Sequence, residues 1–171
     1  MFRLFDSLPQ SVLDRWQEEL SYWPEKEAEV ARRKRVEAYL DRGAGSAWMN
    51  NPQIADMVQT ALLFFDGTRY ALHAWVVMPN HVHALLTPST GWELGDILYS
   101  WKSFTSKECN KILGRPGEFW QKETFDRYVR DQGHYQNAVA YIEGNPVKAG
   151  LCRNPEDWRW GSAHGRCVKE C

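Results

Sequence analysis

The spacing of hydrophobic and polar positions divides the chain into several helical segments and one strongly apolar β segment. Residues 10–20, 24–41 and a stretch beginning at Pro52 have the spacing or the charged composition of helices. Two runs rich in β-branched and aromatic residues, 70–78 (YALHAWVVM) and 81–87 (HVHALLT), flank Pro79-Asn80, which predicts two strands around a tight turn. Both runs are apolar, so we expect this hairpin to lie at the centre of a sheet.

The remaining segments complete an α+β pattern. Residues 2–5 resemble the end of a strand, and 92–113 predict a helix. Residues 118–130 are irregular or a short strand, and a helix over 132–145 is expected to be limited by Pro146. We therefore expect a single domain over 1–171, with helices packed on an antiparallel sheet. Residues 24–41 would be a charged helical insertion, and about 164–171 a tail.

Composition narrows the class of protein. The 171 residues, 43% hydrophobic, suffice for one core. No run of about 18 uncharged apolar residues is present, and the first residues lack the blocks of a signal peptide, so we expect a cytoplasmic protein without a membrane partner. None of the four cysteines forms a Cys-x-x-Cys pair, which favours ordinary thiols over a disulfide framework or a zinc site: Cys109, Cys152, Cys167 and Cys171.

Charge gives a weak and local signal. The net charge is −1, but residues 102–171 hold 12 Lys/Arg against 9 Asp/Glu, whereas residues 1–101 hold 9 against 13. Four cations fall within fourteen residues opposed only by one glutamate: Lys102, Lys107, Lys111 and Arg115. This cluster is either a solvated helix face or a local contact for nucleic acid. The nine tryptophans do not decide between these alternatives, because Trp is common both in hydrophobic cores and in sites that stack on bases.

The clearest candidate for chemistry is His81-Val82-His83. Side chains alternate along a strand, so His81 and His83 project from one face and form half a site for a divalent cation. Ordinary packed histidines are the alternative. A metal would need at least one further ligand.

The helix near residue 140 offers that ligand and a nucleophile. At 100° per residue, His134, Asn137, Tyr141 and Asn145 share one stripe, beside an apolar stripe that includes Tyr135. Tyr141 and Asn145 are four residues apart and reach the same spot. Alternatively, Tyr141 is an amphipathic rim residue and Asn145 a helix terminator before Pro146.

Four ordered motifs bring these residues into one known pattern. The chain resembles the single-tyrosine HUH transposases, and especially the bacterial REP-associated tyrosine transposases, over roughly residues 70–163. The motifs are Trp75-Val76-Val77-Met78-Pro79-Asn80-His81-Val82-His83, Phe119-Trp120-Gln121 with Phe125-Asp126-Arg127, Tyr141-Ile142-Glu143-Gly144-Asn145-Pro146-Val147-Lys148-Ala149-Gly150-Leu151, and Asp157-Trp158-Arg159-Trp160. The Asp6-Ser7-Leu8-Pro9 opening is similar, but less distinctly.

The resemblance implies a ferredoxin-like α+β fold with the histidines on a central strand and the tyrosine on a helix. It implies an enzyme that cuts and rejoins single-stranded DNA beside hairpin-forming palindromes through a 5′-phosphotyrosine. Tyr141 would be the nucleophile, and His81, His83 and Asn145 would hold Mg²⁺ or Mn²⁺. The partner would be single-stranded or hairpin DNA, and the protein a monomer or a homodimer.

DNA contacts must be local in a nearly neutral chain, because phosphates need cations at the binding site. We expect contributions from Lys107, Lys111, Arg127 and Arg130, and stacking of Trp120 on a base, with a core position as the alternative for Trp120.

Two features depart from the related transposases, and two rival functions remain. The first strand is expected to be shorter than in the relatives, and the insertion at 24–41 has no evident DNA role. A palindrome-binding protein without catalysis, or a metal-dependent hydrolase that uses water in place of tyrosine, would also contain part of this residue set.

Overall fold

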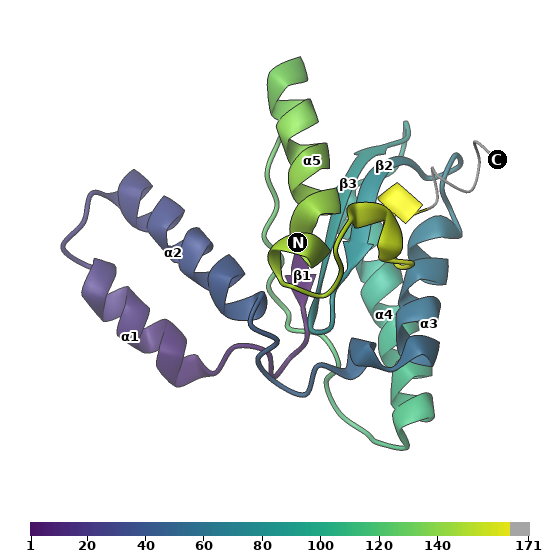
Figure 1. Cartoon of the computed structure of the whole chain (residues 1–171), viewed down its shortest axis with the longest axis horizontal. Helices are drawn as coiled ribbons and strands as arrows, with labels where there is room; N and C mark the ends of the chain where they lie inside the picture. Colours follow the sequence, from purple (N-terminus) through teal and green to yellow (C-terminus); the bar gives the residue numbers. More distant parts are fainter. Residues whose placement is uncertain (165–171) are drawn as a thin grey trace.

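The computed structural model describes residues 1–164 and shows an α+β fold (Figure 1). Strands β1 (Phe2–Arg3), β2 (Tyr70–Val77) and β3 (His81–Pro88) form an antiparallel sheet in the order β1-β3-β2. This confirms the predicted fold class and hairpin, and it places the strand with both histidines at the centre. The predicted tail, with Cys167 and Cys171, lies almost wholly outside the described residues.

Five helices and two short 3₁₀ turns accompany the sheet among the described residues. The helices are α1 (Gln10–Leu20), α2 (Glu25–Leu40), α3 (Pro52–Leu63), α4 (Leu94–Leu113) and α5 (Gln132–Lys148), and the turns are Trp48–Asn50 and Pro155–Asp157. No helix in the described part of the chain has the length and apolarity needed to cross a membrane.

The segment around Trp120 extends the sheet beside β1 without forming a regular strand. Leu4 and Trp120 form an isolated antiparallel bridge. On either side of it, the Phe5 N–H donates to the Phe119 carbonyl at 3.0 Å, and the Gln121 N–H donates to the Arg3 carbonyl at 2.9 Å. The irregular segment predicted for 118–130 therefore takes the sheet position next to the short first strand.

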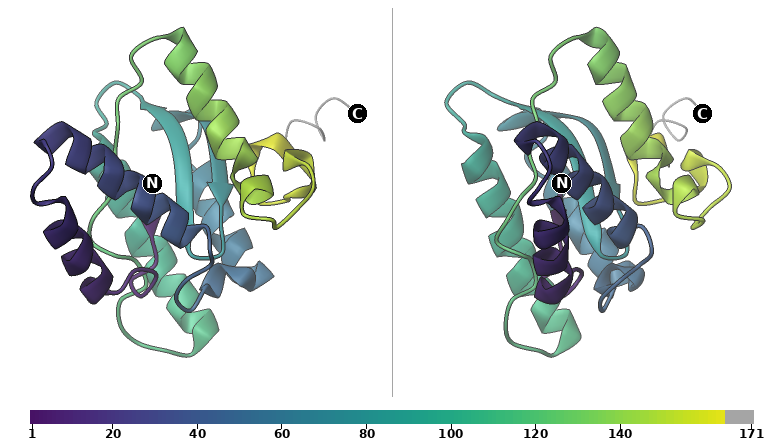
Figure 2. Two further views of the ribbon diagram at one scale, coloured as in Figure 1. Left: turned by 60° about the vertical axis from the view of Figure 1, so that its left-hand side comes forward. Right: turned by 90° about the vertical axis from the view of Figure 1, so that its left-hand side faces the viewer.

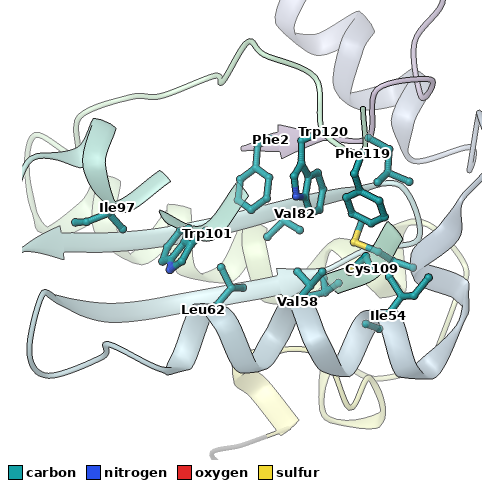
Figure 3. Packing of buried hydrophobic residues seen from close by; sticks show 14 of the residues in the cluster. Phe2, Ile54, Val58, Leu62, Val82, Ile97, Trp101, Cys109, Phe119 and Trp120 are labelled. Atoms are coloured by element: carbon teal, nitrogen blue, oxygen red, sulfur yellow. The ribbon is translucent and has the colours of Figure 1, made fainter. Parts of the chain in front are cut away.

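The two faces of the sheet have different partners because side chains alternate along β3. Val82 is fully buried on the face covered by α3 and α4, where it joins the main hydrophobic cluster (Figure 3). That cluster includes Phe2, Ile54, Val58, Leu62, Ile97, Trp101, Cys109 and Phe119. His81 and His83 project from the opposite face, which α5 covers.

Helix α5 continues through Pro146 to Lys148, so the expectation that Pro146 limits it was wrong. Proline in a helix removes one backbone hydrogen bond and disfavours helical geometry at the preceding residue. Here Pro146 falls in the last turn, where the Ala149 N–H still donates to the Asn145 carbonyl at 2.9 Å. Ile142 fixes the helix on the sheet by packing with Ala74, Val76 and Met78.

Helices α1 and α2 form an antiparallel hairpin, here called the arm (residues 10–41), which projects from the side of the sheet (Figure 1). A separate cluster holds the arm together: Leu8, Leu13, Trp16, Val36 and Leu40. The rotated views show α2 passing across the side of the sheet that faces α5 (Figure 2). The predicted charged insertion is thus a helix that crosses near the histidine face.

The Asp157-Trp158-Arg159-Trp160 motif closes the free edge of β2. The Val77 N–H donates to the Trp160 carbonyl at 2.8 Å, and Trp158 Nε1 donates to the Val77 carbonyl at 3.0 Å. Trp160 Nε1 donates to Asp56 Oδ1 on α3 at 2.8 Å. The motif therefore has a structural role in covering a sheet edge.

Trp120 is a core residue, which corrects the prediction that it stacks on a base. Its side chain is 6% exposed, and its Nε1 donates to Thr105 Oγ1 at 2.8 Å. Its ring forms edge-to-face pairs with the rings of Phe2 and Phe119, with centroids 4.8 and 4.7 Å apart (Figure 3). A ring that is buried in this way is not accessible to a base.

We expect Trp120→Ala to lower the free energy of unfolding by about 3–5 kcal/mol, because it opens a cavity in the main cluster. Urea unfolding followed by circular dichroism measures this change. Trp23→Ala is the matched control, because Trp23 is in the loop that connects α1 to α2 and is 49% exposed. It should lower the free energy of unfolding by less than about 1 kcal/mol. Equal stability of Trp120→Ala and the wild-type protein would contradict the core assignment.

Candidate active site

The structure brings the two histidines and the predicted tyrosine together. His81 and His83 are 0% and 6% exposed, and their ring centroids lie 4.9 Å apart. The His83 ring is 5.5 Å from the ring of Tyr141, which α5 presents to the same face. Asn145, one helical turn beyond Tyr141, is fully buried.

Asn80, in the β2–β3 turn, fixes the orientation of His81. Its Nδ2 donates to the carbonyls of Leu40 at 3.0 Å and Ala44 at 2.8 Å, so its Oδ1 is left as an acceptor. That oxygen lies 2.7 Å from His81 Nδ1, which must therefore carry the proton. His81 consequently presents the lone pair of Nε2 to the site.

The buried polar atoms without a hydrogen-bond partner among the described residues include four on the predicted ligands and Asp41: His81 Nε2, His83 Nε2, Asn145 Oδ1 and Asp41 Oδ1. The side chain of Arg3, which lies opposite His81 in the sheet, is also buried without a partner among these residues. Unpartnered buried polar atoms are rare and costly in folded proteins. Imidazole nitrogen and amide oxygen are both suitable ligands for a divalent cation such as Mn²⁺. The predicted residues therefore fit a metal ion chemically.

The third predicted ligand, Asn145, is an amide and not a charged or imidazole side chain. Within residues 1–164, no three His, Cys, Asp or Glu side chains are already arranged as a metal-binding group.

Both histidines are held neutral. Burial, followed by the positive charges of the N-terminal amine and Lys148, lowers the pKa of His81 to about 3. Burial also lowers the pKa of His83 well below its usual value, as do the charges of His81, the N-terminal amine and Lys148. Neutral imidazoles are the form that binds metal ions.

Tyr141 is 36% exposed, and its hydroxyl is held in the protonated form. Burial raises the pKa of Tyr141, and the negative charges of Glu37 and Asp41 raise it further, while a hydrogen bond from Asn145 acts in the opposite direction. A phenol in this setting becomes a nucleophile when a cation is placed beside it or when a base accepts its proton.

A cleft of about 500 Å³ opens in front of Tyr141. α5 lines it with His134, Asn137 and Tyr141, three of the four residues predicted to share one stripe, and β3 lines it with His83. α2 contributes three charged side chains to the lining: Arg33, Lys34 and Glu37. The arm is therefore part of the site, which the sequence did not indicate.

The residues predicted to bind DNA fall into two groups. Arg127 lines the cleft, and Arg130 is exposed just before α5, where its N–H donates to His134 Nδ1 at 3.3 Å. Lys107 and Lys111 lie on α4, behind the opposite face of the sheet. Lys111 Nζ is also paired with Glu108 at 2.8 Å.

Sequence reasoning missed three residues of the site: Asn80, Asp41 and Glu37. Asn80 could have been recognised, because an Asn immediately before a histidine pair is well placed to orient it. Asp41 and Glu37 could not be recognised, because no local sequence pattern predicts that the end of a charged helix contacts a strand forty residues later.

We expect His81 of the metal-free protein to be the Nδ1–H tautomer, as ¹⁵N imidazole shifts can show, and Asn80→Ala to release it. That substitution should also lower the free energy of unfolding by roughly 2–4 kcal/mol, because it strands two buried carbonyls. Asn110→Ala is the control, since its amide makes a similar 2.7 Å bond to the Gly117 carbonyl at the surface; it should cost less than about 1 kcal/mol. An Nε2–H tautomer in the wild-type protein would refute the assignment.

Comparison with known proteins places this site in a family. The chain is 30% identical over 95 residues to the REP-associated tyrosine transposase of Escherichia coli K12, covering 56% of this chain and 55% of that protein. It is 31% identical over 98 residues to the putative REP-associated tyrosine transposase of Haemophilus influenzae, covering 52% and 56%. The chain thus spans about half the length of these curated relatives.

A solved structure of a REP-associated tyrosine transposase bound to a REP hairpin shares the fold. It superposes with a TM-score of 0.55 at 23% identity, covering 71% of this chain and 70% of that one. The family model for IS200-like transposases matches residues 53–145, a range that contains both histidines, Tyr141 and Asn145. The chain belongs to the IS200-like transposase family.

Proposed function

We propose that this protein cuts and rejoins single-stranded DNA beside hairpin-forming palindromes, with Tyr141 as the nucleophile. The observation that carries this proposal is the position of Tyr141, in an open cleft and 5.5 Å from the ring of a buried histidine whose Nε2 has no partner among the described residues. The relatives named as REP-associated tyrosine transposases, and the structure bound to a REP hairpin, support DNA hairpins as the substrate class.

His81, His83 and Asn145 would hold Mg²⁺ or Mn²⁺ in this site. When bound, the cation would polarise the scissile phosphate and neutralise charge that develops during attack. Asn80 keeps His81 in the tautomer that offers Nε2. The fixed position of Asn145 in the last turns of α5 places its amide one turn from the nucleophile.

Tyr141 and Glu37 would carry out the cleavage step. Tyr141 Oη attacks phosphorus and forms an O–P bond while the bond to the 3′ oxygen breaks. The leaving 3′ oxygen takes up a proton from solvent, so the products are a 5′-phosphotyrosine and a free 3′-OH. Glu37 interacts with the Tyr141 hydroxyl and is suited to accept the phenolic proton. Attack by a 3′-OH reverses the step, so rejoining needs no ATP.

We expect Tyr141→Phe to abolish a protein-linked band when the protein is incubated with a labelled hairpin oligonucleotide and Mn²⁺ and run on a denaturing gel. Hairpin affinity should stay within a few-fold, because only the hydroxyl is removed. Tyr128→Phe and Tyr135→Phe are the controls and should retain the band, as Tyr135 packs against His73. EDTA should suppress the band in the wild-type protein.

Each alternative outcome of this experiment identifies a different function. Free cleaved ends without a protein-linked band indicate a hydrolase that uses water. A shift in a native gel without cleavage indicates a DNA-binding protein that lacks catalysis. A band that survives Tyr141→Phe but not Tyr128→Phe or Tyr135→Phe contradicts Tyr141 as nucleophile.

The position of the cleft also suggests how the DNA strand runs. Lys34 and Arg127 line the same cleft as Tyr141 and are therefore available to a strand that reaches it, whereas Lys107 and Lys111 lie behind the sheet. We propose that Arg127 and Arg130, together with Lys34, contribute most of the phosphate contacts.

Measuring hairpin affinity against salt concentration tests this path. Lys34→Ala/Arg127→Ala should flatten the log–log slope by roughly 0.7–0.9 for each phosphate contact that is lost. Lys107→Ala/Lys111→Ala removes the same charge and should leave the slope nearly unchanged. The reverse result would mean that DNA binds across α4.

A further inference from the structure

Asp41 lies directly after α2 and reaches the histidine site from the arm. One carboxylate oxygen, Oδ2, accepts an ion-pair contact from Lys148 Nζ on α5 at 2.7 Å. The other, Oδ1, lies 4.0 Å from His81 Nε2 and has no hydrogen-bond partner among the described residues. The Asp41 side chain is only 10% exposed, so water does not easily satisfy this oxygen.

The contact between Asp41 and His81 joins two acceptors. His81 Nδ1 donates to Asn80, so Nε2 carries a lone pair, and Asp41 Oδ1 is a carboxylate oxygen. Two buried acceptors that face each other without a proton between them repel, and a cation between them removes the repulsion. Two ligands of one Mg²⁺, each about 2.1 Å from the ion, can lie at most about 4.2 Å apart. The observed 4.0 Å is below that limit. Among the described residues, His81, His83 and Asp41 are not already arranged as a metal-binding group, so a bound cation would draw their side chains closer together.

We propose that Asp41 is an additional, anionic ligand of the divalent cation that His81, His83 and Asn145 would hold; this rests on the metal site of the proposed function. The other three ligands are all neutral, and a carboxylate oxygen is the ligand that Mg²⁺ prefers. Asp41 lies outside residues 53–145, the range that the family model matches. The arm therefore adds a charged ligand to a site that the core of the fold otherwise forms with neutral groups.

Removing Lys148 distinguishes a role of Asp41 as a metal ligand from a purely structural role. If Asp41 only ties the arm to α5, then removing Lys148 should harm the site as much as removing Asp41. If Asp41 is a ligand, Lys148 competes with the cation for its carboxylate, and removing Lys148 should leave metal affinity unchanged or increase it. The two roles therefore predict different effects of removing Lys148: weaker metal binding if Asp41 is structural, and no weakening if it is a ligand.

The experiment is a titration of the DNA-free protein with Mn²⁺, in which free Mn²⁺ is measured by electron paramagnetic resonance. We expect Asp41→Asn to weaken Mn²⁺ binding about 10-fold or more, and Lys148→Met to bind at least as tightly as the wild type. Asp14→Asn is the control for loss of a charge on the same arm: Asp14 is exposed on α1 and accepts a hydrogen bond from Gln10. It should change the affinity by less than about two-fold.

Three results would overturn the proposal, and they are distinguishable. Wild-type affinity in Asp41→Asn, with weaker binding in His83→Ala, would leave the metal site standing and remove Asp41 from it. Equal weakening in Asp41→Asn and Lys148→Met would assign Asp41 to the contact between the arm and α5. Failure of the wild-type protein to bind Mn²⁺ would overturn the metal site of the proposed function itself. Thermal unfolding of each variant without metal shows whether any loss reflects misfolding.

Discussion

The hydrogen bonds of the buried Asn80 amide hold the candidate site together. One amide in the turn between β2 and β3 binds the carbonyl of Leu40 at the end of α2, the carbonyl of Ala44, and the imidazole of the next residue, His81. The turn geometry that joins β2 to β3 thus also fixes the tautomer of His81 and the place where the arm meets the sheet. A side chain that cannot both donate and accept hydrogen bonds would lose either the bonds to the carbonyls of Leu40 and Ala44 or the bond that fixes the tautomer of His81.

The parts of the fold that depend on local patterns were predictable from the sequence. Alternation in HVHALLT places Val82 in the core and both histidines on the other face, and the structure has this arrangement. Helical spacing likewise placed Tyr141 with His134 and Asn137, which line the same cleft. The end of α5 was predicted too early, because Pro146 costs little in a last turn whose neighbouring bonds remain.

What could not be predicted involves residues far apart in sequence. Trp120 meets Phe2 and Thr105, and Asp41 meets Lys148 across 107 positions. The composition of α2 is charged nearly all round, so its sequence does not indicate which side faces the sheet. That orientation follows from Val36 and Leu40, which pack with α1 in the arm's own cluster, and from the Asn80 bonds at its end.

The division of the sheet into two faces explains how the fold tolerates such a site. Burial of apolar side chains against α3 and α4 stabilises one face, where Val82 and Trp101 are almost fully enclosed. On the other face, polar atoms of His81, His83 and Asp41 are buried without hydrogen-bond partners among the described residues, which costs free energy. A ligand that binds only the folded state repays that cost in proportion to its affinity. The face that stabilises the fold and the face suited to chemistry are thus two sides of one strand, separated by the alternation of its side chains.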